Sequence, residues 1–203
     1  MEQVIAAVFT LLTSIADRSA AESLVATAKD TRLTVETAAQ HVAAARFAAV
    51  LTDTDPDLIL AISHHESRFE PTVVGPLLHN GKRACGVMQH VPVAGPCPKR
   101  PLVADYLAGA RHLAWWIRAE RGNIERALAG YAGGYPAIKR YEEGAARVRA
   151  VVRLNLARAR RIKSARELKG VPTVRLERAA SRFPILNPRA WVRRYRILST
   201  TRQ

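Results

Sequence analysis

The sequence predicts a mainly α-helical protein, on three observations. Residues 20–50 are rich in alanine and contain neither proline nor glycine, a composition that favours helix. Apolar residues recur at spacings of three and four over residues 102–120, as on one face of a helix. No segment shows a convincing run of strands. Apolar residues make up 48% of the chain and charged residues 24%, which is ordinary for a globular protein and argues against general disorder.

The most apolar stretch is at the N-terminus, over residues 3–16. A signal peptide is one interpretation, but the preceding Met-Glu-Gln has no lysine or arginine, which such segments normally carry. The stronger interpretation is a helix that continues through residues 20–50. We therefore expect an N-terminal helical segment over residues 1–50, with one or two long helices packed on the body of the protein or on a partner.

A helix start follows at Asp53–Asp57. Asp55 or a neighbour can cap the helix, Pro56 suits its first turn, and the extra carboxylates favour the positive end of the helix dipole. Glycine and proline then punctuate the chain, and they predict loops with a short hairpin near residues 72–90. Further helices are expected over residues 102–120, 123–132 and 137–163, followed by an extended tail over residues 171–203.

The charge of the chain is unevenly distributed. The formal net charge is +15, yet residues 1–144 hold 15 Lys/Arg and 15 Asp/Glu, so residues 145–203 carry the whole excess. Such a basic segment favours an anionic partner, which could be an acidic protein surface, nucleic acid, anionic lipid or the cell wall, although a solvated face is the plainer alternative. We divide the chain into an N-terminal helical segment (1–50), a central domain (51–152) and a basic C-terminal helix and tail (153–203).

Cysteine and histidine give little sign of a metal site. Cys85 and Cys97 are too few for a disulfide scaffold, and one disulfide or two free thiols are equally open. The adjacent His64 and His65 point about 100° apart on a helix, so they do not readily share a metal ion. We expect no metal and no other cofactor. No apolar run reaches the length of a transmembrane helix.

Glu66 is the candidate catalytic residue. On the helix that begins near Asp55, it shares one face with Ile59 and Ile62, at spacings of three and four. A carboxyl group at the end of an apolar stripe is partly desolvated, which raises its pKa and suits a general acid near neutral pH. The alternative from local spacing is a surface glutamate paired with Arg68 or a neighbouring histidine.

Three short sequence motifs, in this order along the chain, resemble those of a known family. They are Glu-Ser-Arg-Phe-Glu-Pro at residues 66–71, Gly-Val-Met-Gln at residues 86–89, and Ala-Leu-Ala-Gly-Tyr-Ala-Gly-Gly at residues 127–134. They resemble the soluble lytic transglycosylase family, which has a goose-type-lysozyme-like fold and the words Glu-Ser-x-Phe-x-Pro, Gly-Leu-Met-Gln and Ala-Tyr-Asn-Ala-Gly. The resemblance covers about residues 50–152 and implies a lysozyme-like central domain.

The resemblance also implies roles for single residues. Glu66 would be the only catalytic acid/base, and Tyr131 would stand close to it and orient its carboxyl group. Other matching positions would line the groove that binds the substrate: Ser67, Gly86, Met88, Gln89 and Gly133.

The chain departs from the family pattern at several positions. Ala132 or Gly133 replaces the family's asparagine, and Arg147 occupies the slot of a later tyrosine. The segment from Pro71 to Gln89 is longer than usual and contains no serine. A catalytically degenerate relative, serving as a structural or interaction protein and docking through its basic tail, is therefore the alternative function.

The implied substrate is the glycan strand of peptidoglycan. The family cleaves the β-1,4 bond between N-acetylmuramic acid (MurNAc) and N-acetylglucosamine (GlcNAc), and it leaves a 1,6-anhydro-MurNAc end. A single carboxylate suffices because the attacking hydroxyl belongs to the substrate, and Glu70 is interpreted as structural. We expect the protein to be part of a phage particle and to open the bacterial cell wall locally for it. The alternative setting is a bacterial secretion machine, with the protein in the periplasm. In either setting, residues 145–203 would bind the other subunits or an acidic protein surface.

Overall fold

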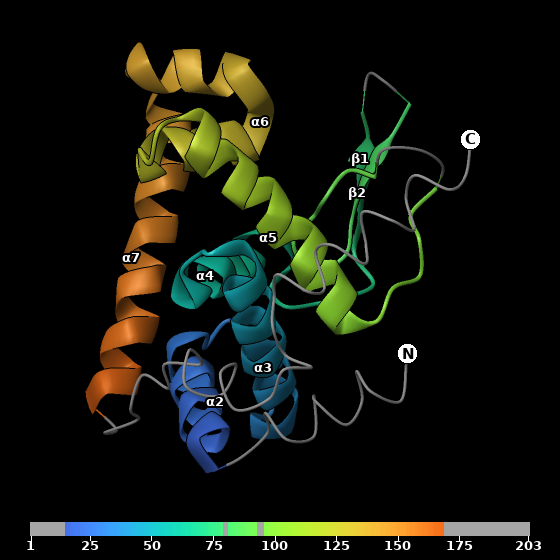
Figure 1. Ribbon diagram of the computed structural model, residues 1–203, viewed down its shortest axis with the longest axis vertical. Coiled ribbons are helices and arrows are strands. Elements are labelled where there is room, and N and C mark those ends of the chain that lie inside the picture. Colours follow the sequence, from blue (N-terminus) through green and yellow to red (C-terminus); the bar gives the residue numbers. More distant parts are fainter. Residues whose placement is uncertain (1–14, 79–80, 93–95, 169–203) are drawn as a thin grey trace. The chain divides into compact units, whose positions relative to one another are not determined.

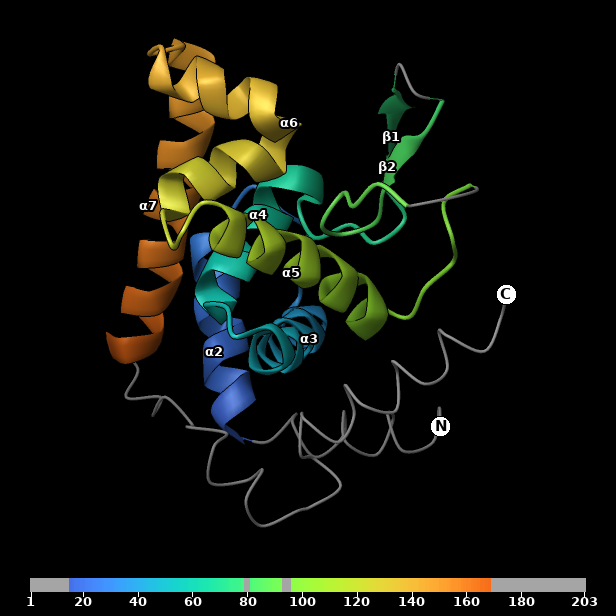
Figure 2. The ribbon, with the colours of Figure 1, turned by 45° about the horizontal axis from the view of Figure 1, so that its top comes forward.

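A computed structural model describes residues 15–78, 81–92 and 96–168, and within them the protein is mainly helical, as predicted. Figures 1 and 2 show the α4 helix among the other helices, α7 along one side, and the two-stranded hairpin away from α7. The described elements are α2 (Ile15–Thr27), α3 (Val35–Thr52), α4 (Pro56–Ser67), β1 (Val74–Leu77), β2 (Arg83–Cys85), α5 (Leu102–Ala119), α6 (Ile124–Glu142) and α7 (Ala146–Leu168).

The prediction of one or two helices through residues 20–50 is confirmed by α2 and α3. A capping box starts α3, in which Thr34 and Thr37 satisfy each other's backbone N–H groups, and Asp53 ends it with a φ of 54°. Both helices belong to the central core, because α3 packs against α2, α4 and α5. Residues 1–14, which hold most of the apolar N-terminal stretch, lie outside the described residues.

The predicted helix start near Asp55 is confirmed in α4. The Asp55 carboxylate accepts a hydrogen bond from the Asp57 N–H at 2.8 Å, and Pro56 is the first helical residue. The α4 helix packs against α3 and α7. A buried ion pair joins its start to the end of α7, with 2.7 Å between the Arg166 guanidinium and the Asp57 carboxylate. Burial outweighs the nearby positive charges and raises the pKa of Asp57 to about 6.

The helix predicted over residues 102–120 is confirmed as α5, whereas the prediction of one helix over residues 137–163 is wrong. There α6 continues to Glu142 and α7 begins at Ala146. Gly144 causes the break, because its φ of 88° is incompatible with a continuing α-helix. The sequence predicts that one helix ends at residue 132 and the next begins at residue 137. In the structure this interruption is a kink within α6, where Gly133 and Gly134 have non-helical backbone angles. The predicted tail over residues 171–203 lies outside the described residues.

The predicted hairpin is present as the antiparallel strands β1 and β2. A disulfide joins Cys85, at the end of β2, to Cys97, so the structure answers the question that the sequence left open. It closes the segment that leads from the hairpin toward α5. Among the described helices, none is both long and apolar enough to cross a lipid bilayer.

Candidate active site

Glu66 lies in the last turn of α4, on the face that it shares with Ile59 and Ile62. Both isoleucines are fully buried, and the glutamate side chain is half-buried. Burial raises the pKa of the Glu66 carboxyl group from 4.5 to about 7. Across residues 15–78, 81–92 and 96–168, no group forms a hydrogen bond or ion pair with this carboxyl group.

The pKa of Glu66 matters for chemistry. At neutral pH, a carboxyl group with a pKa near 7 is present in both its protonated and its ionised form. It can therefore donate a proton in one step and accept one in the next, as a general acid/base must. The alternative of a surface glutamate paired with Arg68 is not what the structure has, because Arg68 lies near Asp30 instead, at 4.0 Å.

Tyr131, on α6, lies close enough to Glu66 for their charges to interact. Burial raises the pKa of the Tyr131 hydroxyl group, and the negative charges of Glu66 and Asp105 raise it further. The hydroxyl group donates a hydrogen bond to the Met88 carbonyl oxygen at 2.7 Å. The two predicted catalytic residues thus lie within electrostatic reach of each other, while the Tyr131 hydroxyl proton is directed at the Met88 carbonyl oxygen.

The Gly86–Gln89 segment forms a tight turn between the disulfide and the site. The Val87 N–H donates a hydrogen bond of 2.5 Å to the Asp105 carboxylate of α5. Gly86 has a φ of 72°, and a Cβ atom there would lie only 2.1 Å from the same carboxylate. Glycine is therefore required at this position both by the backbone conformation and by the space available.

Other predicted substrate-binding residues hold this turn in place. The Ser67 hydroxyl group is buried, 2.8 Å from the Val87 carbonyl oxygen and 3.1 Å from that of Ser63. The Gln89 side-chain amide donates hydrogen bonds to the Val73 and Gly86 carbonyl oxygens, at 3.0 and 2.9 Å. Both side chains thus connect α4 or the hairpin to the turn, and their contact with a sugar stays a prediction.

The buried Met88 packs against α5, where a Cβ atom on Gly109 would lie 2.5 Å from the methionine side chain. Gly133 is exposed at the break in α6, beside Gly134, whose φ of 69° and ψ of −166° favour glycine. The break follows Tyr131 by two residues, so the backbone after the tyrosine turns away from the helix. The approach of a substrate to Gly133 stays a prediction.

Sequence reasoning missed two residues of α5 that face this site, Asp105 and His112. The His112 ring lies 5.0 Å from the Tyr131 ring between centroids, and it accepts a hydrogen bond from the Trp116 indole N–H at 2.9 Å. Burial lowers the pKa of His112, so the ring is neutral near pH 7. Helical spacing in the sequence could have indicated that these residues share one face of α5. The spacings of four, three and four connect Asp105, Gly109, His112 and Trp116.

Within the described part of the chain, which excludes His79, the histidines do not gather around one point. His64 contacts Asp30 and His65 contacts Arg158, so these neighbours point to different partners, as their helical spacing predicts. His90 instead stacks edge-on against His112. Among the residues with described positions, no group of three or more His, Cys, Asp or Glu side chains could hold a metal ion.

Glu70 lies at the loop that follows α4, exposed to solvent. Its carboxylate accepts hydrogen bonds from the Thr72 hydroxyl and N–H groups, at 2.7 and 3.1 Å, and these bonds lower its pKa. The pKa values of the two glutamates are therefore shifted in opposite directions, and of the two only Glu66 is partly protonated near pH 7.

Comparisons with known proteins leave the interpretation of this site to its geometry. No family model, curated protein or solved structure matches the chain.

Proposed function

We propose that this protein is a peptidoglycan lytic transglycosylase with a lysozyme-like central domain, and that Glu66 is its single catalytic acid/base. The observation that carries the proposal is the half-buried Glu66 carboxyl group with a pKa of about 7, within electrostatic reach of Tyr131. The adjacent Ser67 and Tyr131 both form hydrogen bonds to the Gly86–Gln89 turn. Glu66, the Gly86–Gln89 turn and Tyr131 belong to the three sequence motifs that resemble those of the family.

The proposed reaction uses one carboxyl group twice, first as an acid and then as a base. Protonated Glu66 donates its proton to the glycosidic oxygen between MurNAc and GlcNAc, the bond from that oxygen to MurNAc C1 breaks, and an oxocarbenium-like state forms. Ionised Glu66 then takes the proton of the C6 hydroxyl group of the same MurNAc, whose oxygen bonds to C1. The products are a free GlcNAc hydroxyl group and a 1,6-anhydro-MurNAc end, and no water is consumed.

A single carboxylate is sufficient because the attack is intramolecular, which gives it a high effective concentration over water. Glycosidases with two catalytic carboxylates need the second one as a nucleophile or base. Here the nearby carboxylates have other partners: Glu70 accepts hydrogen bonds from Thr72, and Asp105 accepts one from the Val87 N–H. Glu66, by contrast, has no such hydrogen-bond partner among the described residues, so it is the carboxyl group that we assign to the reaction.

The basic C-terminal part has a docking role in the proposal. We infer that residues 145–203 hold the enzyme on an acidic protein surface of a phage particle, or of a secretion machine, that acts at the bacterial wall. The support is the outer surface of α7, where the arginines repel one another and favour an acidic partner. The exposed arginines of α7 are Arg147, Arg149, Arg153, Arg160 and Arg161.

Replacing Glu66 by glutamine tests the enzymatic proposal, because the shape is kept and the exchangeable proton is lost. Purified sacculi are digested with the natural chain, with Glu66→Gln and with Glu70→Gln as the matched control, and the muropeptides are analysed by mass spectrometry. We expect anhydro-muropeptides from the natural chain and from Glu70→Gln, and a loss of at least about a hundredfold for Glu66→Gln.

Three outcomes would contradict the proposal. Equal release by the natural chain and Glu66→Gln would exclude Glu66 as the acid. New reducing ends in place of anhydro ends would show hydrolysis by water. No release by any variant would favour the degenerate structural protein, whose working part is the basic tail.

The docking role is tested by the double variant Arg153→Glu/Arg160→Glu. We expect it to lose binding to poly-glutamate, which stands in for an acidic protein surface, while its cleavage of sacculi is unchanged. Tighter binding of duplex DNA than of poly-glutamate, with a steep dependence on salt, would instead indicate a nucleic-acid partner.

A further inference from the structure

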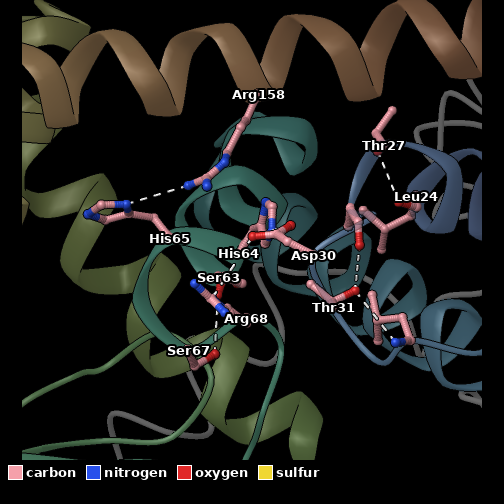
Figure 3. Close-up of polar contacts among 12 residues, drawn as sticks. Leu24, Thr27, Asp30, Thr31, Ser63, His64, His65, Ser67, Arg68 and Arg158 are labelled. Carbon is pink, nitrogen blue, oxygen red and sulfur yellow. Dashed lines mark hydrogen bonds and ion pairs between the residues drawn. The ribbon is translucent and has the colours of Figure 1, made fainter.

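A pocket of about 220 Å³ lies between α2, α4 and α7, on residues that the proposed glycan cleavage does not use. Its volume is that of about seven water molecules in the liquid, at ~30 Å³ each, which is enough for a small organic molecule. Figure 3 shows Arg158 reaching from α7 toward α4, with His64 and Asp30 beside it. The lining residues are Leu24, Thr27, Ala28, Asp30, His64, Leu154, Arg158, Arg161 and Ile162.

Among the residues whose positions the structure gives, Asp30 supplies the one carboxylate that lines this pocket, and it already has partners. The Asp30 carboxylate lies 2.7 Å from His64 Nε2, and its other oxygen lies 4.0 Å from Arg68 Nε. Burial lowers the pKa of His64, so its ring is neutral near pH 7 and donates its N–H to Asp30. Asp30 therefore does not neutralise both arginines of the pocket.

The two arginines of the pocket lack a carboxylate partner among the described residues. The Arg158 Nη1 atom lies 3.4 Å from His65 Nδ1, a ring nitrogen that carries no negative charge. Loss of hydration lowers the pKa of the half-buried Arg158, and repulsion from Arg161 and Arg68 lowers it further, although Asp30 opposes the change. A guanidinium group removed from water without a counter-charge is costly, and a bound anion would offset that cost.

Apolar side chains make up much of the remaining lining of the pocket: Leu24 and Ala28 at the end of α2, and Leu154 and Ile162 on α7 beside the two arginines. With neutral His64, two arginines and one aspartate give the lining a net charge of +1. One negative charge balances this lining, whereas a phosphate dianion would exceed it. A carboxylate also matches the planar guanidinium fork of an arginine, and it leaves an attached short chain to contact the apolar side chains of the lining.

We propose that this pocket binds a small monocarboxylate with a short apolar chain, its carboxylate held by Arg158 and Arg161 and its chain in contact with Leu24, Leu154 and Ile162. The site is separate from the Glu66 chemistry in its residues, so its test needs no enzymatic activity.

The test is a titration of the full chain at pH 8 and constant ionic strength, followed by NMR chemical shifts and by calorimetry. The probes are butyrate, inorganic phosphate and butylammonium, which separate the apolar carboxylate from a bare oxyanion and from a cation. The variants are Arg158→Gln and Arg161→Gln, and Arg160→Gln is the matched control, since Arg160 is exposed on the same helix and does not line the pocket.

We expect saturable binding of butyrate that Arg158→Gln and Arg161→Gln each weaken by about tenfold, as for a charged hydrogen bond, and that Arg160→Gln leaves unchanged. Circular dichroism checks that each variant is folded. The proposal is overturned if butyrate does not bind, if phosphate binds as tightly as butyrate, if butylammonium binds equally, or if neither pocket arginine affects the affinity of the folded protein.

Discussion

Replacing Glu66 by glutamine should stabilise the protein at alkaline pH, although it should abolish activity. Burial raises the pKa of Glu66 from 4.5 to about 7, so the folded protein holds a proton that the unfolded chain has released. At about 1.4 kcal/mol per pH unit, ionising this group in the folded state costs about 3 kcal/mol. Glutamine cannot ionise, and the variant is spared that cost.

The sign of the pH dependence follows from the two pKa values. Below pH 4.5 the carboxyl group is protonated in both states and costs nothing. Between pH 4.5 and about 7 the folded state binds more protons than the unfolded state, so the stability of the natural chain falls relative to the variant. Above about pH 7 the difference is complete and stays constant.

Urea denaturation at pH 4.5, 6 and 8 measures this difference. With an m-value of about 2 kcal/mol/M, we expect the midpoint of Glu66→Gln to exceed that of the natural chain by about 1.5 M at pH 8. The excess should nearly vanish at pH 4.5. Other titrating groups cancel, because both proteins contain them.

Glu70→Gln is the matched control, since hydrogen bonds from Thr72 lower the pKa of Glu70. Its pH dependence should be weak and opposite in direction, because glutamine there removes a favourable charge. The reasoning is refuted if the stability difference for Glu66→Gln is independent of pH, or if it grows toward acid.

Three further predictions concern the neighbourhood of Glu66. Gly86→Ala should lower the free energy of unfolding by at least about 2 kcal/mol, because the new Cβ would lie 2.1 Å from a buried carboxylate oxygen and the backbone φ of 72° disfavours alanine. Gly81→Ala is the control, since Gly81 has a similar φ of 74° but open space around it, and it should cost clearly less in the same urea assay. Replacing Cys85 and Cys97 together by serine should cost about 3 kcal/mol, as expected for a loop closed over 12 residues, and reduction of the natural chain should cost the same. Tyr131→Phe should cost about 1–2 kcal/mol in unfolding free energy, because a buried carbonyl group loses its hydrogen bond; an unchanged urea midpoint would count against that bond.

Local chemistry explains which parts of the fold could be predicted from sequence. The start of α4 is encoded by Asp55 and Pro56 themselves, and the pKa of Glu66 follows from its spacing to two isoleucines on the same helix. The break at Gly144 was missed because glycine is tolerated inside helices at modest cost. The backbone shows that the helix ends there, through the φ of 88° at Gly144 and the hydrogen bond from the Ala145 N–H to the Arg140 carbonyl oxygen at 2.8 Å.

The parts that could not be predicted depend on residues far apart in the chain. The pocket between α2, α4 and α7 brings together Asp30, His64 and Arg158, and no spacing within one helix connects them. Asp105 accepts its hydrogen bond from the backbone of Val87, 18 residues away, across a turn whose shape the sequence did not specify. The state of the two cysteines depended likewise on how close the fold brings them.

The small side chains of α3 have a consequence for how this protein can change over evolutionary time. Six alanines of this helix are buried, so its backbone lies close to α2, α4 and α5. Replacing one of them by glycine costs about 1 kcal/mol of helix propensity, whereas enlarging one forces neighbouring helices apart and costs about 1–3 kcal/mol. Sequence drift along α3 is therefore confined to the smallest residues, and insertion of bulk there would displace α4, the helix that carries Glu66. The buried alanines are Ala38, Ala43, Ala44, Ala45, Ala48 and Ala49.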